Sequence, residues 1–319
     1  MTDNSAKWKE IRAIRGLIYR TNLLRQRADF VLGGVNAYLG LRLQPNRDRP
    51  QIAAVVVGRN DDYMSDFAAR LHATLEWNIR YLISEVIFVE WNPPPDRELL
   101  STELTKRFPC LRAYVVPPEI HQAICLNPHV PLLEYHAKNV GIRRAQSPWI
   151  MATNADAALG LDTISRLLAA ELDQNTAWTA ERVDIAWRED EQQSLDLIES
   201  LRYRRFNKYQ QLGTGEFVLA SRELWRRTRA YDEAMVRHRF GCDVRGTAQM
   251  LSCGAQLAYA GSMLHLMHPT SCAEGLQPHH GESASWEDGL PYQNDENWGL
   301  DDYKEIQLSE RVWQLQRPA

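Results

Sequence analysis

The sequence lacks long apolar runs, an export signal and a strong excess of charge, and each absence excludes a class of protein. No run reaches the roughly 18 apolar residues that a transmembrane helix needs, so no membrane span is expected. The first ten residues, MTDNSAKWKE, lack the apolar core of a signal peptide. A net charge of −4 argues against a dedicated nucleic-acid binder, and nucleic acid is not an expected partner.

Cysteine is scarce and scattered among the 319 residues. The five cysteines show no CxxC spacing, and an odd, dispersed set without an export signal predicts reduced thiols in a cytoplasmic protein. The sequence also lacks the GxGxxG and GxxxxGK[ST] patterns, which argues against an ordinary dinucleotide-binding fingerprint and a P-loop. Hydrophobic residues make up 44% of the chain, enough for a sizeable core.

The segment from Glu134 to Gly160 carries the clearest chemical signal. A polar helix and a Ser-Pro break lead into a short apolar strand that ends in Asn154-Ala155-Asp156. Residues i and i+2 of an extended segment face the same way, so the side chains of Asn154 and Asp156 are expected to converge. Two oxygen ligands at a strand end suit a hard divalent cation, Mn²⁺ or Mg²⁺. A turn that ends the strand is the ordinary alternative.

Apolar runs alternate with helical patterns in the first half of the chain. Expected strands cover 52–57, 85–90, 111–116 and 149–153, and expected helices begin near 65, 97 and 132. This alternation predicts an α/β fold with a mostly parallel, Rossmann-type central sheet and helices on both faces. Ligands of such sheets bind beyond the carboxyl ends of the strands. Polar clusters follow three of the predicted strands, at 58–62, 90–92 and 154–156.

The rest of the chain is less regular, and we expect four regions. Residues 1–48 read as a basic amphipathic helical extension that packs on its own domain, joins a homo-oligomer or contacts a membrane surface. Residues 49–160 read as one half of the main domain, built from alternating strands and helices, and 161–300 as a less regular second half that ends in a long loop. Residues 161–210 look mostly helical, strands are expected near 216–220 and 256–260, and 301–319 read as a C-terminal tail.

Taken in order, these motifs resemble those of GT-A glycosyltransferases, in particular enzymes similar to family 2, over roughly residues 52–270. VVVGRNDD resembles the first strand, VIFVEWNPP the second, AKNVGIRRA the helix before the metal strand, and TNAD the Asp-x-Asp site. GTGEFVLASRELW and YDEAM resemble the acceptor side, and HLMHP resembles the late loop that supplies a metal-binding histidine. The resemblance implies a metal-dependent enzyme that moves a sugar from a nucleotide-diphosphate donor, UDP or GDP, to a hydroxyl on a small molecule or glycan.

The resemblance also implies that residues 49–160 bind the nucleotide sugar and that residues 161–300 bind the acceptor and carry a lid loop. It further implies roles for individual residues. Nucleotide contacts would come from Gly58, Arg59, Asn60, Asp61, Glu90, Lys138, Asn139, Arg143 and Asn154, and metal ligands would be Asp156 and His268. Lys138 or Arg143 would assist the diphosphate, because cations pair well with phosphate oxygens. Asp243 would be the catalytic base of an inverting displacement. Asn154 stands where the family carries its first aspartate, so the site has one negative charge fewer.

Plainer readings of the same residues stay open. Asp243 is equally suited to cap a helix, and Glu90 to end a strand at the surface. His265 and His268 could form a separate metal site with His279 and His280. A nucleotidyltransferase is an alternative function, although the segment after the first strand is acidic rather than rich in glycine and basic residues. A non-catalytic nucleotide-binding module on the same scaffold is another.

The segment from His268 to Leu300 is long and irregular in sequence. It is rich in histidine, tryptophan, glycine and acids, and long irregular segments in compact domains are often functional. We expect it to cover the site as a lid, with Trp286 and Trp298 in ordered contact.

Overall fold

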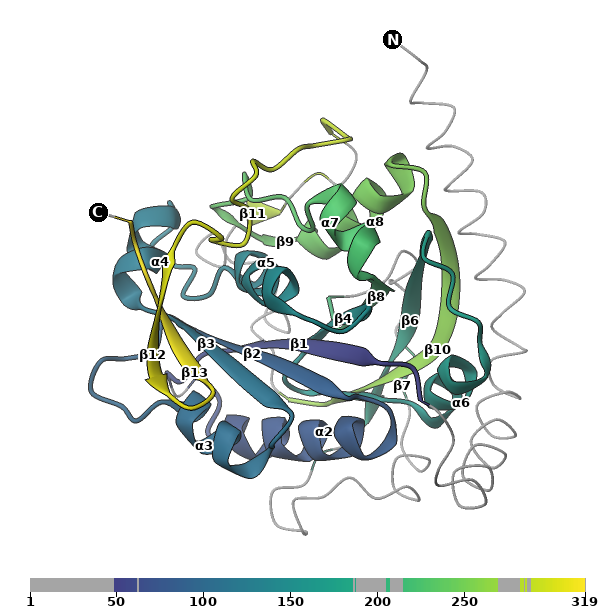
Figure 1. The fold of residues 1–319 in the computed structure, drawn as a ribbon, viewed down its shortest axis with the longest axis horizontal. Coiled ribbons are helices and arrows are strands. Elements are labelled where there is room, and N and C mark those ends of the chain that lie inside the picture. The colour runs from purple at the N-terminus through teal and green to yellow at the C-terminus, as the bar shows by residue number, and fades with distance from the viewer. Residues whose placement is uncertain are drawn as a thin grey trace.

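A large mixed sheet with helices on both faces dominates the computed structural model (Figure 1). The structure describes residues 49–61, 63–185, 187, 205–206, 215–268, 282–283, 285 and 288–318. The predicted helical extension at 1–48 lies outside these ranges. Among the described residues, no helix is long and apolar enough to cross a membrane.

The strands of the first half match the expected ones closely. They are β1 (Ile52–Gly58), β2 (Glu85–Trp91), β3 (Leu111–Val116) and β4 (Trp149–Asn154), followed by the short β5 (Ala157–Leu159). The pairs β3·β2, β2·β1 and β1·β4 are all parallel. The seven residues of β1 are all buried, because helices cover both faces of this part of the sheet.

The second half extends the same sheet with antiparallel pairs. Its strands are β6 (Thr176–Ile185), β7 (Arg205–Phe206), β8 (Phe217–Ser221) and β10 (Gln256–Leu266). With β12 (Lys304–Ser309) and β13 (Val312–Gln316) at one edge, the order is β12-β13-β3-β2-β1-β4-β8-β6-β10-β5, with β7 on β6. β8 runs antiparallel to both β4 and β6, and β10 runs parallel to β6 and antiparallel to β5. An α/β fold with a mixed, mostly parallel sheet is therefore confirmed.

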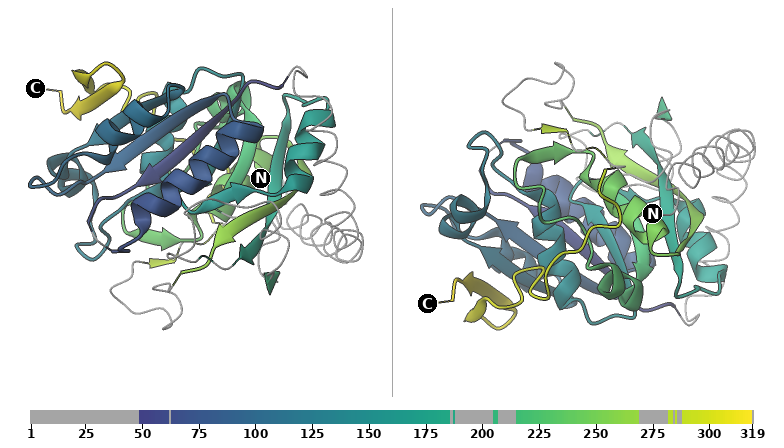
Figure 2. Two further views of the ribbon diagram at one scale, coloured as in Figure 1. Left: turned by 90° about the horizontal axis from the view of Figure 1, so that it is seen from below. Right: turned by 90° about the horizontal axis from the view of Figure 1, so that it is seen from above.

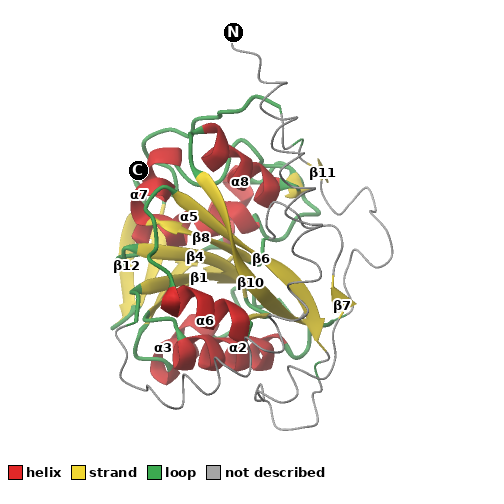
Figure 3. Ribbon diagram, turned by 90° about the vertical axis from the view of Figure 1, so that its right-hand side faces the viewer, coloured by secondary structure: helices red, strands yellow, loops and turns green. Residues whose placement is uncertain are grey.

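Helices form a layer on each side of the sheet (Figures 1 and 3). On one side lie α2 (Phe67–Tyr81), α3 (Leu100–Arg107) and α6 (Leu161–Ala169). On the other lie α4 (Pro118–Ile124), α5 (Glu134–Arg144), α7 (Arg222–Thr228) and α8 (Cys242–Ser252). Alternate residues of β1 serve the two cores: Val56 packs toward α2, whereas Val55 and Val57 pack toward α5.

The approach of α5 to β1 depends on Gly141. A Cβ at this position would lie 2.4 Å from Cγ1 of Val55, which is inside van der Waals contact. Glycine thus lets the helix lie directly on the sheet, and the helix carries Glu134 and Lys138 to the carboxyl edge of β1 and β4.

Three parts of the fold differ from the expectation. Residues 161–210 are not mostly helical in their described part, because Thr176–Ile185 form strand β6 inside the sheet. Residues 301–319, expected as a tail, contain the hairpin of β12 (Lys304–Ser309) and β13 (Val312–Gln316), and β13 pairs with β3 (Figure 2). A small second sheet joins β9 (His238–Phe240) to β11 (Glu282–Ser283).

Candidate active site

A pocket opens where β1 and β4 end, at the edge of the sheet predicted to hold the ligand. Its walls come from segments far apart in the chain: the end of β1, the start of α5, the turn after β4, strand β9 and the end of β10. The lining residues are Val57, Gly58, Arg59, Tyr63, Phe67, Pro131, Leu132, Glu134, Tyr135, Asn154, Ala155, Asp156, His238, Arg239 and His268.

One wall of the pocket holds a carboxylate between two histidines. Oδ2 of Asp156 lies 2.9 Å from Nε2 of His268 and 3.3 Å from Nε2 of His265. One ligand atom from each of the three residues lies within 4.8 Å of the others. The cluster forms because β10 runs antiparallel to β5, which places His265 opposite Ala157, next to Asp156.

A second layer of charges holds this cluster. Nδ1 of His265 lies 2.9 Å from Asp184, and Arg182 pairs with both Asp184 and Glu216 at 2.7 Å. Burial would lower the pKa of His265, but the two aspartates outweigh it and raise that pKa to about 9. Burial likewise opposes ionisation of Asp156, yet hydrogen bonds and charge from the histidines hold its pKa well below the usual range.

These residues fit a divalent cation. A carboxylate that stays ionised and two imidazoles in reach of one point are a suitable donor set, and cation binding would displace the imidazole proton. The carboxylate on the second histidine nitrogen is the usual arrangement that orients a metal-binding imidazole.

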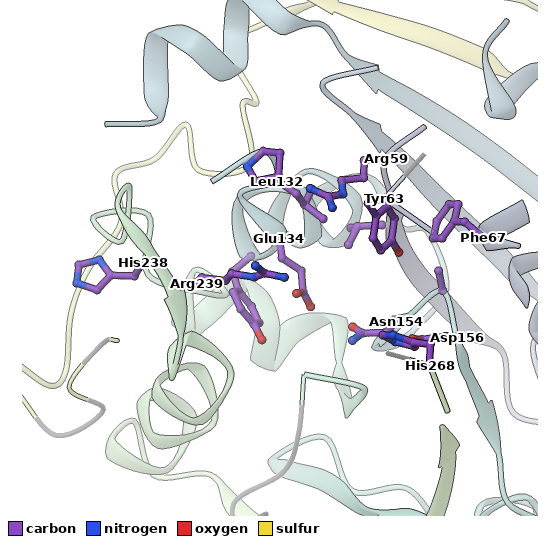
Figure 4. A pocket seen from close by; sticks show the side chains of 15 residues that line it. Arg59, Tyr63, Phe67, Leu132, Glu134, Asn154, Asp156, His238, Arg239 and His268 are labelled. Atoms are coloured by element: carbon purple, nitrogen blue, oxygen red, sulfur yellow. The ribbon is translucent and has the colours of Figure 1, made fainter. Parts of the chain in front are cut away.

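The opposite wall of the pocket is positively charged. Figure 4 shows Arg59 and Arg239 across the opening from Asn154, Asp156 and His268. Nε of Arg59 lies 3.2 Å from Asp61, and its guanidinium stacks 4.1 Å above the Tyr63 ring. Burial and the neighbouring Arg239 lower the pKa of Arg59, while Asp61 and Tyr63 oppose that shift. Two guanidiniums held close together favour an anionic ligand between them.

Lys138 lies beneath the pocket and joins three of its parts. The lysine is fully buried, and its ammonium donates to Oε1 of Glu134 at 2.6 Å, to Oδ1 of Asn154 at 2.8 Å and to the carbonyl of Gly215 at 2.6 Å. The predicted contact of Lys138 with a diphosphate therefore does not appear, because all three ammonium hydrogens are engaged inside the protein.

Asp243 lies beside the pocket, in the first turn of α8. Its Oδ2 accepts a hydrogen bond of 2.9 Å from the backbone N–H of Gly215, the same residue whose carbonyl binds Lys138. Burial raises the pKa of Asp243 to about 6, and the negative charges of Glu216 and Glu134 add to this. A carboxylate of that pKa is ionised at neutral pH and still basic enough to take a proton.

Several predicted site residues have other places in the structure. Glu90 is fully buried and accepts hydrogen bonds from Leu100 and Ser101 at the start of α3, so it caps a helix rather than facing the ligand. Arg143 points away from the pocket, pairs with Asp301 and stacks on Trp298.

Two further predicted residues form hydrogen bonds inside the protein rather than lining the pocket. The amide of Asn139 donates to Tyr231 and Glu233, and that of Asn60 donates to the carbonyl of Glu98. By contrast, Gly58, Arg59, Asn154, Asp156 and His268 all line the pocket.

Residues 269–281, 284, 286 and 287 of the predicted lid lie outside the described ranges, and these include Trp286, His279 and His280. Its described end packs against the helices: Asn294 donates to the carbonyl of Tyr231, and Tyr292 accepts a hydrogen bond from Gln249 through its carbonyl. Trp298 is buried, so this tryptophan belongs to the core and not to a sugar-binding face.

Comparisons with known proteins concern the fold. No protein-family model matches the chain, and the comparison with curated proteins gives no match. Similar solved structures include GalNAc-T7 with UDP, GalNAc and Mn²⁺, at 11% identity and a TM-score of 0.48 over 70% of this chain and 45% of that one. The mannosyltransferase PcManGT from Pyrobaculum calidifontis, with GDP-Man and Mn²⁺, has 15% identity and a TM-score of 0.43 over 78% and 68%. TarS from S. aureus has 12% identity and a TM-score of 0.44 over 69% and 37%.

The chain thus spans under half the length of two of these proteins. At such identities and TM-scores these matches carry no argument about function, and the function proposed below rests on the geometry of the site.

Proposed function

We propose that the chain is a metal-dependent glycosyltransferase that takes its sugar from a nucleotide-diphosphate donor. The observation that carries the proposal is the cluster of Asp156, His265 and His268, of which Asp156 and His268 line the same pocket as Arg59 and Arg239. A diphosphate is an anion that both a divalent cation and guanidiniums bind.

The cation would bind to Asp156, His265 and His268. When bound, it would neutralise the negative charge that builds on the leaving diphosphate. Because imidazole nitrogens suit Mn²⁺ better than Mg²⁺, which prefers all-oxygen sites, we expect Mn²⁺ to be the stronger activator. Arg59 and Arg239 would bind diphosphate oxygens from the other side, and Tyr63 offers an aromatic face beside them.

Asp243 is the candidate base for an inverting transfer. It would accept the proton of the acceptor hydroxyl while that oxygen attacks the sugar. The hydrogen bond from the backbone N–H of Gly215 to Oδ2 orients this carboxylate beside the pocket.

Thermal unfolding of the full chain with UDP, GDP, ADP or dTDP tests the donor assignment. A nucleotide that binds the folded state at 100 times its Kd should stabilise it by about 2.7 kcal/mol, more with Mn²⁺ than with EDTA. If none of the four gives a metal-dependent shift, the assignment is wrong. Release of a nucleoside diphosphate from the matching sugar nucleotide would separate this reaction from a nucleotidyltransferase, which releases pyrophosphate.

A further inference from the structure

The side-chain amide of Asn154 is oriented in a way that suggests a contact with the donor. This inference rests on the function proposed above. Asn154 lines the pocket two residues before Asp156, where the resemblance leads one to expect a metal-binding carboxylate. Its carbonyl oxygen is already used, because it accepts a hydrogen bond of 2.8 Å from the ammonium of Lys138.

The ammonium of Lys138 also fixes the orientation of that amide. An ammonium only donates, so the oxygen of Asn154 must face it and the NH₂ group must face elsewhere. Lys138 itself cannot turn, since it is fully buried and its other two hydrogens bind Glu134 and Gly215 at 2.6 Å each. Within the described part of the chain, the NH₂ group of Asn154 donates to no protein acceptor.

We propose that Lys138 holds Asn154 so that its NH₂ group donates a hydrogen bond to an oxygen of the sugar diphosphate, and that Asn154 is not a metal ligand. His265 takes the place that the missing carboxylate would fill, because it brings a third ligand atom to Asp156 and His268. Asn154 at the end of β4 and Asp156 in the turn after it both line the pocket, so an oxygen held near Asp156 lies close to the amide.

At position 154 an amide suits this contact better than a carboxylate. An aspartate here would pair with Lys138, lose the N–H donor and repel the phosphate oxygens. Lys138 is accordingly a positioning residue, and Asn154 is the group that touches the donor.

Two separate binding measurements test the proposal on the full chain. Mn²⁺ binding without nucleotide is followed by the signal of free Mn²⁺, and the binding of UDP, GDP and inorganic pyrophosphate is followed by calorimetry in EDTA and in Mn²⁺. The variants are Asn154→Ala and Asn154→Asp. The control is Asn297→Asp, which makes the same change of charge at an exposed residue that does not line the pocket.

We expect both Asn154 variants to bind Mn²⁺ within about twofold of the wild type. Removal of one hydrogen bond worth about 1 kcal/mol should weaken the diphosphate ligand about fivefold in Asn154→Ala. The added repulsion should weaken it further in Asn154→Asp, and Asn297→Asp should bind like the wild type. In a Lys138→Met background the effect of Asn154→Ala should shrink, because the amide is no longer held.

Two results would overturn the role of Asn154. One is a tenfold change in Mn²⁺ affinity in Asn154→Ala or Asn154→Asp, in either direction, which would make residue 154 part of the metal site. The other is unchanged diphosphate binding in both variants. Failure of the wild type to bind any nucleotide would instead refute the proposed function, and the Mn²⁺ and pyrophosphate measurements would still decide the role of Asn154.

Discussion

Asp243 couples the proposed chemistry to a stability that depends on pH. Its pKa rises from 3.8 to about 6 in the folded chain, so the folded state binds more protons than the unfolded state between these values. Stability contributed by this group therefore falls as pH rises from about 4 to 6, and the cost is fully present above pH 6.

Asp243→Asn should remove that cost. At pH 8 we expect the variant to gain about 1 to 2 kcal/mol, a value discounted because the side chain is partly accessible, and at pH 4 we expect no gain. Urea unfolding at the two pH values measures the difference. Release of nucleoside diphosphate should fall by about 10² or more if Asp243 is the base. A variant that keeps wild-type turnover would show that the acceptor proton leaves by another route.

We expect the carboxylate of Asp156 to be required for metal binding. Asp156→Asn keeps the shape of the side chain but removes the charge next to His265 and His268, so Mn²⁺ binding and the Mn²⁺-dependent shift with nucleotide should both disappear. Asp302→Asn, an exposed acid remote from the pocket, is the control. The measurement is Mn²⁺ titration of the two variants side by side, and retained binding in Asp156→Asn would place the cation elsewhere.

At the scale of elements, the contact of α5 with β1 fixes the pocket floor. Gly141→Ala would gain up to about 1 kcal/mol of helix propensity but force a methyl group into Val55, which typically costs about 1 to 3 kcal/mol. We expect a net loss of stability in urea and weaker nucleotide binding, since Lys138 lies one turn away. Adding Val55→Ala makes room for the methyl group and should restore both. If the single variant is as stable as the wild type, the helix and sheet are less tightly apposed.

The start of α3 depends on Glu90. Glu90→Ala would leave the backbone N–H groups of Leu100 and Ser101 without an acceptor, and each buried unsatisfied group costs about 1 to 3 kcal/mol. Stability in urea should fall by that order while the affinity for nucleotide stays the same. A selective loss of affinity without loss of stability would return Glu90 to the nucleotide contact that the sequence motif suggested.

Strands with a simple apolar pattern could be predicted from the sequence, whereas strands without such a pattern could not. Nearly every residue of β1 to β4 is buried, and the sequences of these strands are therefore apolar runs rich in β-branched residues. The sequence of β6 does not show a strand pattern, because it carries Glu181, Arg182 and Asp184. In the structure Arg182 pairs with Asp184, and Glu181 accepts a hydrogen bond from the hydroxyl of Tyr259. The hairpin of β12 and β13 was missed because β12 is exposed along its whole length and has no apolar face to mark it.

At the scale of the whole molecule, the site was only half visible in the sequence. Asn154 and Asp156 are two residues apart, at the end of β4 and in the turn after it, so their place in one pocket follows from local chain geometry. His265 reaches Asp156 only through the antiparallel register of β10 with β5, across more than 100 residues, and Arg239 arrives on the separate sheet of β9 and β11. No local pattern encodes such contacts, because they depend on strand order.

The continuous sheet leads to a last prediction about cooperativity. Strands of the predicted donor half (β1 to β4) and acceptor half (β6, β8 and β10) share one hydrogen-bonded sheet, and the core on the α5 side includes residues of both, such as Val55 and Trp225. The described parts of the two halves should therefore unfold together. Calorimetry should show one main transition, and Mn²⁺ with UDP or GDP should move all of it upward by mass action. Asp156→Asn should show the same single transition without the upward shift. Two transitions, of which nucleotide moves only one, would mean that the halves are separate folding units despite their common sheet.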